Sequence, residues 1–291
     1  MSAHIVILGS SGFIGKALLE YLRRTGSVPV RGLRSADLDL TSPNCVDTLC
    51  RQLTHDTILI VTARARRGSN PFSTFEADIT IATNVASCLA RVGVGRCVYF
   101  STTAVYGDME SDLCITEETR IAPSSLYGIA KFASECVLKH VAEKAGIPLV
   151  LLRLCMVYGP GDTSQAYGPT RFIQSILREG RVHLFGDGSE GRDYLFIQDL
   201  VQITERFVCG DHSGTFNLAT GHSYSFQDLI TCLRSFMPAG FEVIHLERDG
   251  PQADQRLNPA KLLGVLPGFQ FTELKQGLFE TYNYFSARLS G

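Results

Sequence analysis

Hydrophobic residues in the first 160 positions follow two alternating patterns. Short runs of consecutive apolar residues, as in strands buried on both faces, are separated by longer stretches in which apolar residues recur with helical spacing. The apolar runs predict strands near 4–8, 28–33, 57–62, 96–101 and 148–154. The helical spacing predicts helices near 13–25, 43–53, 78–93 and 126–145. This alternation predicts an α/β fold with a doubly wound parallel sheet and right-handed crossovers.

After residue 160 the pattern loosens into loops that contain glycine and proline, with helices near 169–179, 199–209, 225–236 and 272–287. The change predicts two lobes, residues 1–165 and 166–291, with the second interleaved with the first. A chain of 291 residues is long enough to give both lobes a core.

Charge and composition argue against several classes of protein. The formal net charge is −2 and no long basic run occurs, so neither nucleic acid nor an anionic membrane is expected as a partner. No apolar stretch approaches the roughly 20 residues of a membrane span, and the N-terminus begins a strand instead of a signal peptide, so we expect a soluble, cytoplasmic protein. The nine cysteines are scattered and never form Cys-x-x-Cys. We expect them to be reduced and mostly buried, with no disulfide framework and no metal site.

A glycine-rich turn follows the first predicted strand. His4-Ile-Val-Ile-Leu8 leads directly into Gly9-Ser-Ser-Gly-Phe-Ile-Gly15, where a helix begins. The glycines allow a tight turn and close approach of the backbone to a pyrophosphate, and the opening helix offers free N–H groups and the positive end of its dipole. Strand, turn and helix in this order predict a dinucleotide site.

Tyr127 and Lys131 lie on one face of the predicted helix near 126–145, because residues four apart are neighbours on a helix. An ammonium one turn away favours the phenolate, so Tyr127 can exchange a proton with a substrate hydroxyl. A solvated helix face is the alternative for an isolated Tyr-x-x-x-Lys.

The GxxGxxG spacing and a Tyr-x-x-x-Lys that begins 112 residues after Gly15 together resemble the extended short-chain dehydrogenase/reductase family, particularly its members that act on nucleotide sugars. The resemblance implies a Rossmann-type NAD(P)-binding domain over residues 1–165 and a smaller substrate-binding lobe over 166–291. It also implies a nucleotide-sugar substrate. Homodimers are frequent in this family, and the helices near 78–93 and 126–145 are long enough to form the interface.

The family also suggests roles for individual residues. Thr102 lies four residues before Tyr106 in Ser101-Thr-Thr-Ala-Val-Tyr106 and matches the hydroxyl that polarises the reacting substrate oxygen beside Tyr127. Thr103 is the alternative for this role and is also expected to contact the substrate. Lys131 holds the cofactor ribose. Asn84 matches the asparagine that steadies the loop near the nicotinamide ribose, or is simply a satisfied buried amide. The remaining expected cofactor contacts are Gly9, Ser11, Gly12, Phe13, Ile14, Gly15, Thr62 and Ala63, with Asp39 and Leu40 at the adenine edge.

Cofactor choice depends on the end of the second strand, where many NAD-using relatives place an acidic residue. Arg34 stands there instead. A guanidinium binds a 2′-phosphate bidentately and Ser35 adds a donor, so NADP is expected, with NAD as the alternative. The loop 64–67 carries three further arginines, either as a second phosphate clamp or as an exposed face.

In the second half, the segment 185–199 is similar to the family segment whose arginine holds the substrate diphosphate, which assigns that role to Arg192. Asp193 and Asp199 are expected to hold the loop and cap the next helix. Arg248 or Arg256 is expected as a second diphosphate ligand, or as a surface charge.

Departures from the family pattern narrow the chemistry. Thr103-Ala104 replaces the acid pair of the dehydratases, Ala104 also replaces the cysteine of the combined 3,5-epimerase/reductases, and Met156 stands where many epimerases carry asparagine. The sequence therefore favours a keto-reductase of a nucleotide-linked deoxysugar. The alternatives are an NAD-dependent nucleotide-sugar 4-epimerase and a non-catalytic dinucleotide-binding protein.

Overall fold

The computed structural model describes residues 3–26, 28–66, 68, 70–107, 114–163, 168–237, 240–248 and 254–289. Contacts divide the chain into two compact units. The first unit contains Met1–Gly107, Thr119–Leu154 and Val201–Phe216, and the second contains Asp108–Glu118, Cys155–Leu200 and Asn217–Gly291. The chain thus passes between the units several times.

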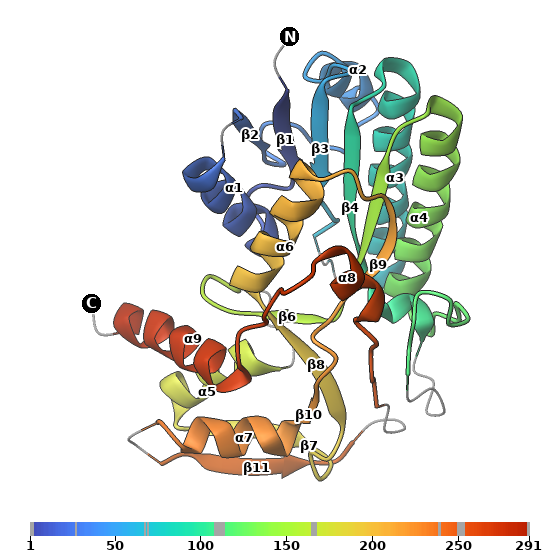
Figure 1. The fold of residues 1–291 in the computed structure, drawn as a ribbon. Helices are drawn as coiled ribbons and strands as arrows, with labels where there is room; N and C mark the ends of the chain where they lie inside the picture. The colour runs from blue at the N-terminus through green and yellow to red at the C-terminus, as the bar shows by residue number, and fades with distance from the viewer. Residues whose placement is uncertain are drawn as a thin grey trace. The chain divides into compact units, whose positions relative to one another are not determined.

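The first unit is built around a six-stranded sheet (Figure 1). Its order is β2-β1-β3-β4-β5-β9, and the registers of β1 with β2 and β3, of β3 with β4 and of β4 with β5 are parallel. The strands are β1 (His4–Leu8), β2 (Val30–Leu33), β3 (Thr57–Val61), β4 (Arg96–Thr102), β5 (Leu149–Leu154) and β9 (Gly214–Leu218). The chain runs outward from β1 to β2 and then returns to β3, so the switch point lies between β1 and β3.

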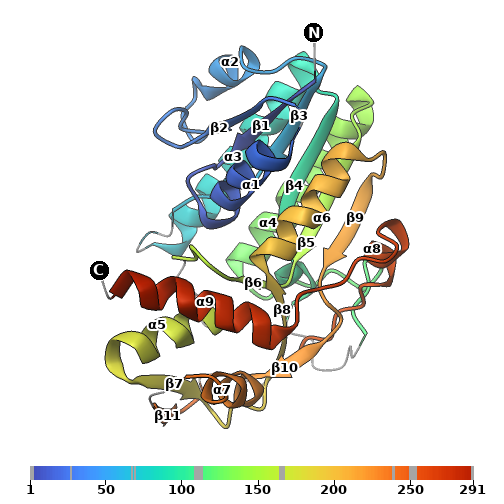
Figure 2. The same ribbon diagram turned by 60° about the vertical axis from the view of Figure 1, so that its left-hand side comes forward.

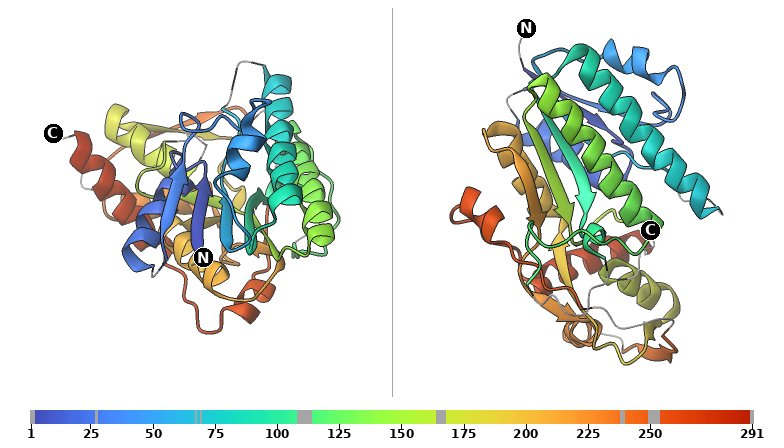
Figure 3. Two further views of the ribbon diagram at one scale, coloured as in Figure 1. Left: turned by 90° about the horizontal axis from the view of Figure 1, so that it is seen from above. Right: turned by 90° about the vertical axis from the view of Figure 1, so that its right-hand side faces the viewer.

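Helices cover both faces of this sheet. Figures 2 and 3 show α3 and α4 on one face and α1 and α6 on the other. The helices are α1 (Phe13–Thr25), α2 (Cys45–Cys50), α3 (Pro71–Val92), the 3₁₀ turn η1 (Thr103–Tyr106), α4 (Leu126–Ala145) and α6 (Ile197–Cys209). The predicted α/β fold with a doubly wound parallel sheet is confirmed.

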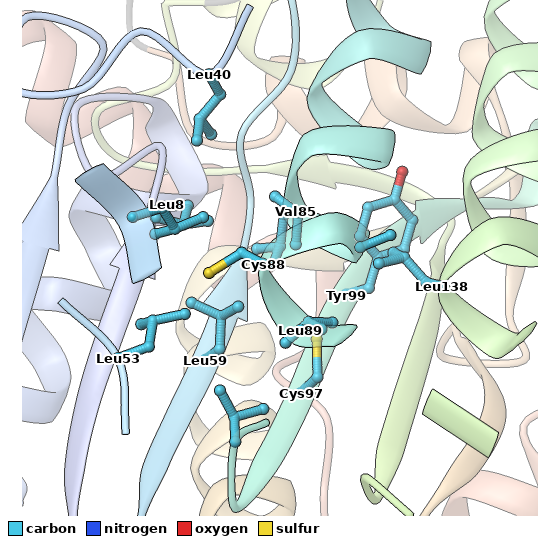
Figure 4. Packing of buried hydrophobic residues seen from close by; sticks show 14 of the residues in the cluster. Leu8, Leu40, Leu53, Leu59, Val85, Cys88, Leu89, Cys97, Tyr99 and Leu138 are labelled. Carbon is cyan, nitrogen blue, oxygen red and sulfur yellow. The ribbon is translucent and has the colours of Figure 1, made fainter. Parts of the chain in front are cut away.

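The main core lies between the sheet and α2, α3 and α4. Figure 4 shows part of this cluster of buried residues, in which strand side chains meet the inner faces of the helices. Leu59, Val85 and Leu138 are fully buried. Unbroken apolar strands are needed here because both faces of the sheet are covered.

Helix ends follow local chemistry that the hydrophobic pattern does not contain. α3 begins seven residues earlier than predicted, because the Asn70 side chain accepts a hydrogen bond from Phe72 N at 2.9 Å and Pro71 occupies the first turn. α4 begins where Ser125 Oγ accepts from Gly128 N at 3.1 Å and ends at Gly146, whose φ of 64° suits glycine.

The second unit contains two small sheets. One has the order β10-β8-β6, and the other pairs β11 with β7 in parallel. Its strands are β6 (Met156–Tyr158), β7 (Arg181–Phe185), β8 (Gly191–Phe196), β10 (Ser223–Ser225) and β11 (Glu242–Leu246). Its helices are α5 (Pro169–Glu179), α7 (Phe226–Arg234), α8 (Ala260–Val265) and α9 (Leu274–Leu289). Aromatic packing fills this unit, with the rings of Phe172 and Phe226 5.8 Å apart.

The cysteines were only partly predicted. All nine are free, and Cys45, Cys88, Cys97 and Cys155 are buried. Cys50 and Cys232 are half-buried, and Cys114, Cys136 and Cys209 are exposed, so the expectation that most are buried was wrong. None of the helices in the described ranges is long and apolar enough to cross a membrane. Among the same residues, no group of histidine, cysteine and acidic side chains gathers into a metal site.

Candidate active site

The glycine turn after β1 has room only for glycine at two positions. Gly9 has a φ of +85°, and a Cβ there would lie 2.7 Å from the backbone of Ala63. A Cβ on Gly15 would lie 2.3 Å from Gly9 O. The turn therefore brings the start of α1 close to the end of β3, at the switch point where ligands of such sheets bind.

The N-terminus of α1 has the features of an anion site. Gly12 is extended, gives the helix no side-chain cap, and no acidic residue lies in the first turn. Ser11 and Gly12 are exposed, and Phe13 and Ile14 are half-buried. The first N–H groups of a helix without a side-chain cap are free to bind a diphosphate, with the helix dipole in its favour. The residues present thus fit the diphosphate of a dinucleotide.

Thr62 and Ala63 close the other side of this turn. Thr62 N donates to Leu8 O at 3.0 Å, and Thr62 Oγ1 donates to Leu8 O at 2.8 Å. Both residues are half-buried. Thr62 therefore fixes the loop after β3 against the glycine turn.

Asn84 is half-buried and its side-chain amide is hydrogen-bonded, which agrees with the alternative of a satisfied amide. Its Nδ2 donates to Leu40 O at 2.9 Å, and Cys45 Sγ lies 3.5 Å from the same carbonyl. Asn84 therefore holds the segment after β2, which is expected at the adenine edge. Asp39 Oδ1 accepts from Thr41 N at 2.9 Å and from Thr41 Oγ1 at 2.7 Å, which makes its carboxylate part of a local turn.

Arg34 is paired with Asp37, three residues further along the chain. Its Nε and Nη2 each lie 2.9 Å from a carboxylate oxygen of Asp37, and Asp37 also accepts from Arg34 N at 3.0 Å. The Arg34 hydrogen bonds hold the pKa of Asp37 well below its usual range. Arg34 and Ser35 are exposed. In the basic loop 64–67, the structure describes Arg64, whereas Arg67 lies outside the described residues.

Tyr127 and Lys131 occupy one face of α4, as predicted. Lys131 is only 6% exposed, and its Nζ donates to Phe100 O at 2.8 Å and to Tyr99 Oη at 3.3 Å. Burial lowers the pKa of Lys131, against the opposing effects of the Tyr127 and Asp78 charges. Tyr127 is half-buried, with the Arg64 guanidinium carbon 4.6 Å from its ring centre.

Thr102 ends β4 next to this helix. Its Oγ1 accepts a hydrogen bond from Ala104 N at 3.2 Å and so caps η1, which leaves the hydroxyl proton for another acceptor. Thr102 and Thr103 are both buried. A Cβ on Gly128 would lie 2.6 Å from Ala104 O, so the start of α4 packs directly on η1. The structure therefore brings Tyr127 and Thr102 to the same corner of the unit.

A buried ion pair supports this corner. Arg153 Nη2 and Nε lie 2.7 and 3.0 Å from the two carboxylate oxygens of Glu135, and Arg153 Nη1 donates to Tyr106 Oη at 2.9 Å. Ser101 Oγ donates to Glu135 as well. The network connects β4, η1, α4 and β5 around the catalytic candidates. Sequence reasoning missed Glu135, although it follows Lys131 by one helical turn on the same face.

The second unit brings its two expected diphosphate ligands together. Arg192 and Arg248 both contact the carboxylate of Glu190. Asp193 accepts from Thr220 N at 3.0 Å and from Gly221 N at 2.8 Å, and so holds a loop. The expectation that Asp199 caps a helix was wrong. It lies inside the first turn of α6, and its oxygens accept from Thr272 N at 2.9 Å and Oγ1 at 2.7 Å.

The chain is similar to known proteins in both sequence and fold. The model of the NAD dependent epimerase/dehydratase family matches residues 5–219. The chain is 31% identical over 258 residues to ADP-L-glycero-D-manno-heptose-6-epimerase of Cupriavidus pinatubonensis, covering 77% of this chain and 75% of that protein. It is 27% identical over 289 residues to GDP-6-deoxy-D-talose 4-dehydrogenase of Aggregatibacter actinomycetemcomitans, covering 96% of each. A structure of RMD from Pseudomonas aeruginosa complexed with NADPH has the same fold, with a TM-score of 0.87 at 22% identity over 99% of this chain and 100% of that one.

Proposed function

The chain belongs to the NAD-dependent epimerase/dehydratase family, and we propose that it is an NADP-dependent keto-reductase of a nucleotide-linked deoxysugar. The observation that carries the proposal is the corner where α4 presents Tyr127 next to the turn capped by Thr102, with Lys131 buried one helical turn further on. The similarity to a GDP-6-deoxy-D-talose dehydrogenase along nearly the whole chain supports this choice of substrate class.

Each of the three residues has a distinct task in the proposed reaction. The coenzyme, when bound, supplies the hydride for the keto carbon of the sugar. Thr102 donates its hydroxyl proton as a hydrogen bond to the reacting oxygen, and Tyr127 transfers a proton to that oxygen as charge develops on it. Lys131 carries a charge held in a dry environment, where it stabilises the phenolate that Tyr127 becomes.

Other residues provide binding. The glycine turn with Gly9 and Gly15 and the uncapped start of α1 would hold the coenzyme diphosphate, and Arg34 would bind a 2′-phosphate. The Arg34–Asp37 pair is exposed, and exposed ion pairs are weak, so a 2′-phosphate can compete with Asp37. In the second unit, Arg192 and Arg248 would bind the diphosphate of the substrate.

A 4-epimerase that oxidises and re-reduces one carbon on a retained NAD is the second candidate. It would use the same three residues, and the 31% identical relative is an epimerase. Asp37 beside Arg34 also favours NAD over NADP, since a carboxylate repels a 2′-phosphate. The two candidates differ in coenzyme traffic, because a reductase releases its coenzyme in every turnover.

The proposal is tested by incubating the protein with NADPH and 4-keto deoxysugars linked to UDP, GDP, dTDP or ADP. We expect one of them to cause oxidation of NADPH, followed by its absorbance. Tyr127→Phe should lower this rate at least about a hundredfold with NADPH affinity nearly unchanged, because it removes the proton donor alone. Tyr21→Phe on α1 is the matched control. Unchanged turnover in Tyr127→Phe would refute the assignment.

A further inference from the structure

Glu190 lies between the two arginines of the proposed diphosphate site. Its Oε1 contacts Arg192 Nη2, and its Oε2 lies 3.0 Å from Arg248 Nη1. All three side chains are 16–17% exposed. Each carboxylate oxygen thus takes one guanidinium, which is the arrangement that a phosphate with two free oxygens would adopt between two arginines.

The arginines are held by their surroundings. Arg192 lies on β8, and its Nη1 donates to Gly191 O at 3.0 Å. Arg248 packs against Gly186, where φ is +63° and a Cβ would lie 3.0 Å from Arg248 Nε. Arg248 Nη1 is buried and has no aligned hydrogen-bond acceptor among the described residues, despite its short distance to Glu190. This donor is therefore available to a better acceptor.

Charge decides whether Glu190 and a diphosphate can share the site. Two guanidinium groups face the single carboxylate of Glu190. The pKa of the nearby Asp187 carboxyl is lowered mainly by hydrogen bonds from Ser189, and the charge of Arg248 lowers it further. A nucleoside diphosphate brings at least two further negative charges. Like charges at contact distance in a partly desolvated site repel strongly.

We propose that Glu190 is a built-in competitor, which occupies the diphosphate position in the ligand-free protein and turns away when a nucleoside diphosphate binds between Arg192 and Arg248. This inference rests on the proposed function of those two arginines. Glu190 keeps the paired cations neutralised between turnovers, and its return favours release of the product. It therefore lowers the affinity of the site, because binding must first break its two ion pairs.

The test is calorimetric titration of the full-length protein with pyrophosphate, UDP, GDP and ADP. We expect Glu190→Gln to bind the preferred probe at least about threefold more tightly than wild type, with a gain that shrinks as salt is added. Arg192→Gln and Arg248→Gln should each weaken binding about tenfold. Glu242→Gln is the control, because it also removes one negative charge but lies at the end of β11 opposite Leu246. It should leave the affinity for the probe unchanged.

Thermal unfolding separates competition from a structural role. Without ligand, Glu190→Gln should lower Tm, because the two arginines then face each other without a carboxylate. A competitor gives this loss of stability together with a gain in affinity. A residue that only braces the loop would lower both, so unchanged or weaker binding in Glu190→Gln overturns the inference. If the arginine variants bind like wild type, or no probe binds to any variant, the diphosphate site of the proposed function itself is wrong.

Discussion

The Arg64 guanidinium carbon lies 4.6 Å from the centre of the Tyr127 ring. This cation packs on the proposed proton donor and also counts among the charges that lower the pKa of Lys131, after burial. A cation over an aromatic face is favourable, so this contact helps to hold the Tyr127 ring in place. Arg64 therefore makes a contact that neither a phosphate clamp nor an exposed face would predict.

Arg64→Gln should lower kcat about threefold to tenfold while coenzyme affinity changes less, since the contact is with Tyr127. Arg66→Gln removes an exposed arginine from the same loop and is the control. Steady-state kinetics and fluorescence titration measure the two effects. An equal loss of activity in both variants would mean that only the charge of the loop matters.

Lys131 should give the protein a distinctive pH dependence. Its folded-state pKa is lowered by burial below the value near 10.5 of the unfolded chain. Between these two values the unfolded state binds more protons, so the contribution of this residue to stability rises with pH. We expect the stability of wild type relative to Lys131→Met to increase over this window in urea unfolding. A relative stability that is flat or falls would contradict the assigned direction.

The Glu135–Arg153 pair is expected to matter for folding. Their side chains are 0% and 4% exposed, and Glu135→Gln would leave Arg153 buried without its counter-ion. The cost should be about 3–5 kcal/mol of unfolding free energy. Arg91→Ala breaks the exposed pair with Asp47 and should cost under about 1 kcal/mol. Comparable losses of unfolding free energy in the two variants would show that the buried pair stabilises the fold no more than the exposed pair does.

Coenzyme preference should respond to Arg34 and Asp37 in opposite directions. Arg34→Gln removes the proposed 2′-phosphate ligand, so the ratio of NADPH to NADH affinity should fall about tenfold. Asp37→Asn removes the carboxylate that now occupies the guanidinium, so the same ratio should rise. Titration with both coenzymes measures the ratio. A ratio that Arg34→Gln does not change would remove the structural basis for an NADP preference.

The sequence predicted the first unit well because its signals are local and strong. β1, α1 and α4 have the predicted bounds, since unbroken apolar runs, glycine and a serine cap mark them clearly. In the second unit, α5, α7 and α9 were predicted, but α8 and all five strands were missed. Those strands have three to six residues and lack long apolar runs, and their partners are distant along the chain.

The site shows the same division between local and distant signals. Spacing predicted Tyr127, Lys131 and the glycine turn as parts of the site, because each pattern lies within one element or one turn. The partners that adjust these groups, such as Arg64 on Tyr127, come from other elements of the fold. For Asn84 the sequence left open a contact near the nicotinamide ribose or a satisfied amide, and only the fold shows that it donates to Leu40 O. The position of a side chain on a helix does not specify which loop it meets.

The most direct test of the reductase assignment is to denature freshly purified protein, identify any dinucleotide that it releases, and titrate the stripped protein with NADPH and NADH. A diffusible-coenzyme reductase predicts an empty site that binds NADPH more tightly than NADH. Stoichiometric NAD carried through purification would contradict it and favour the epimerase.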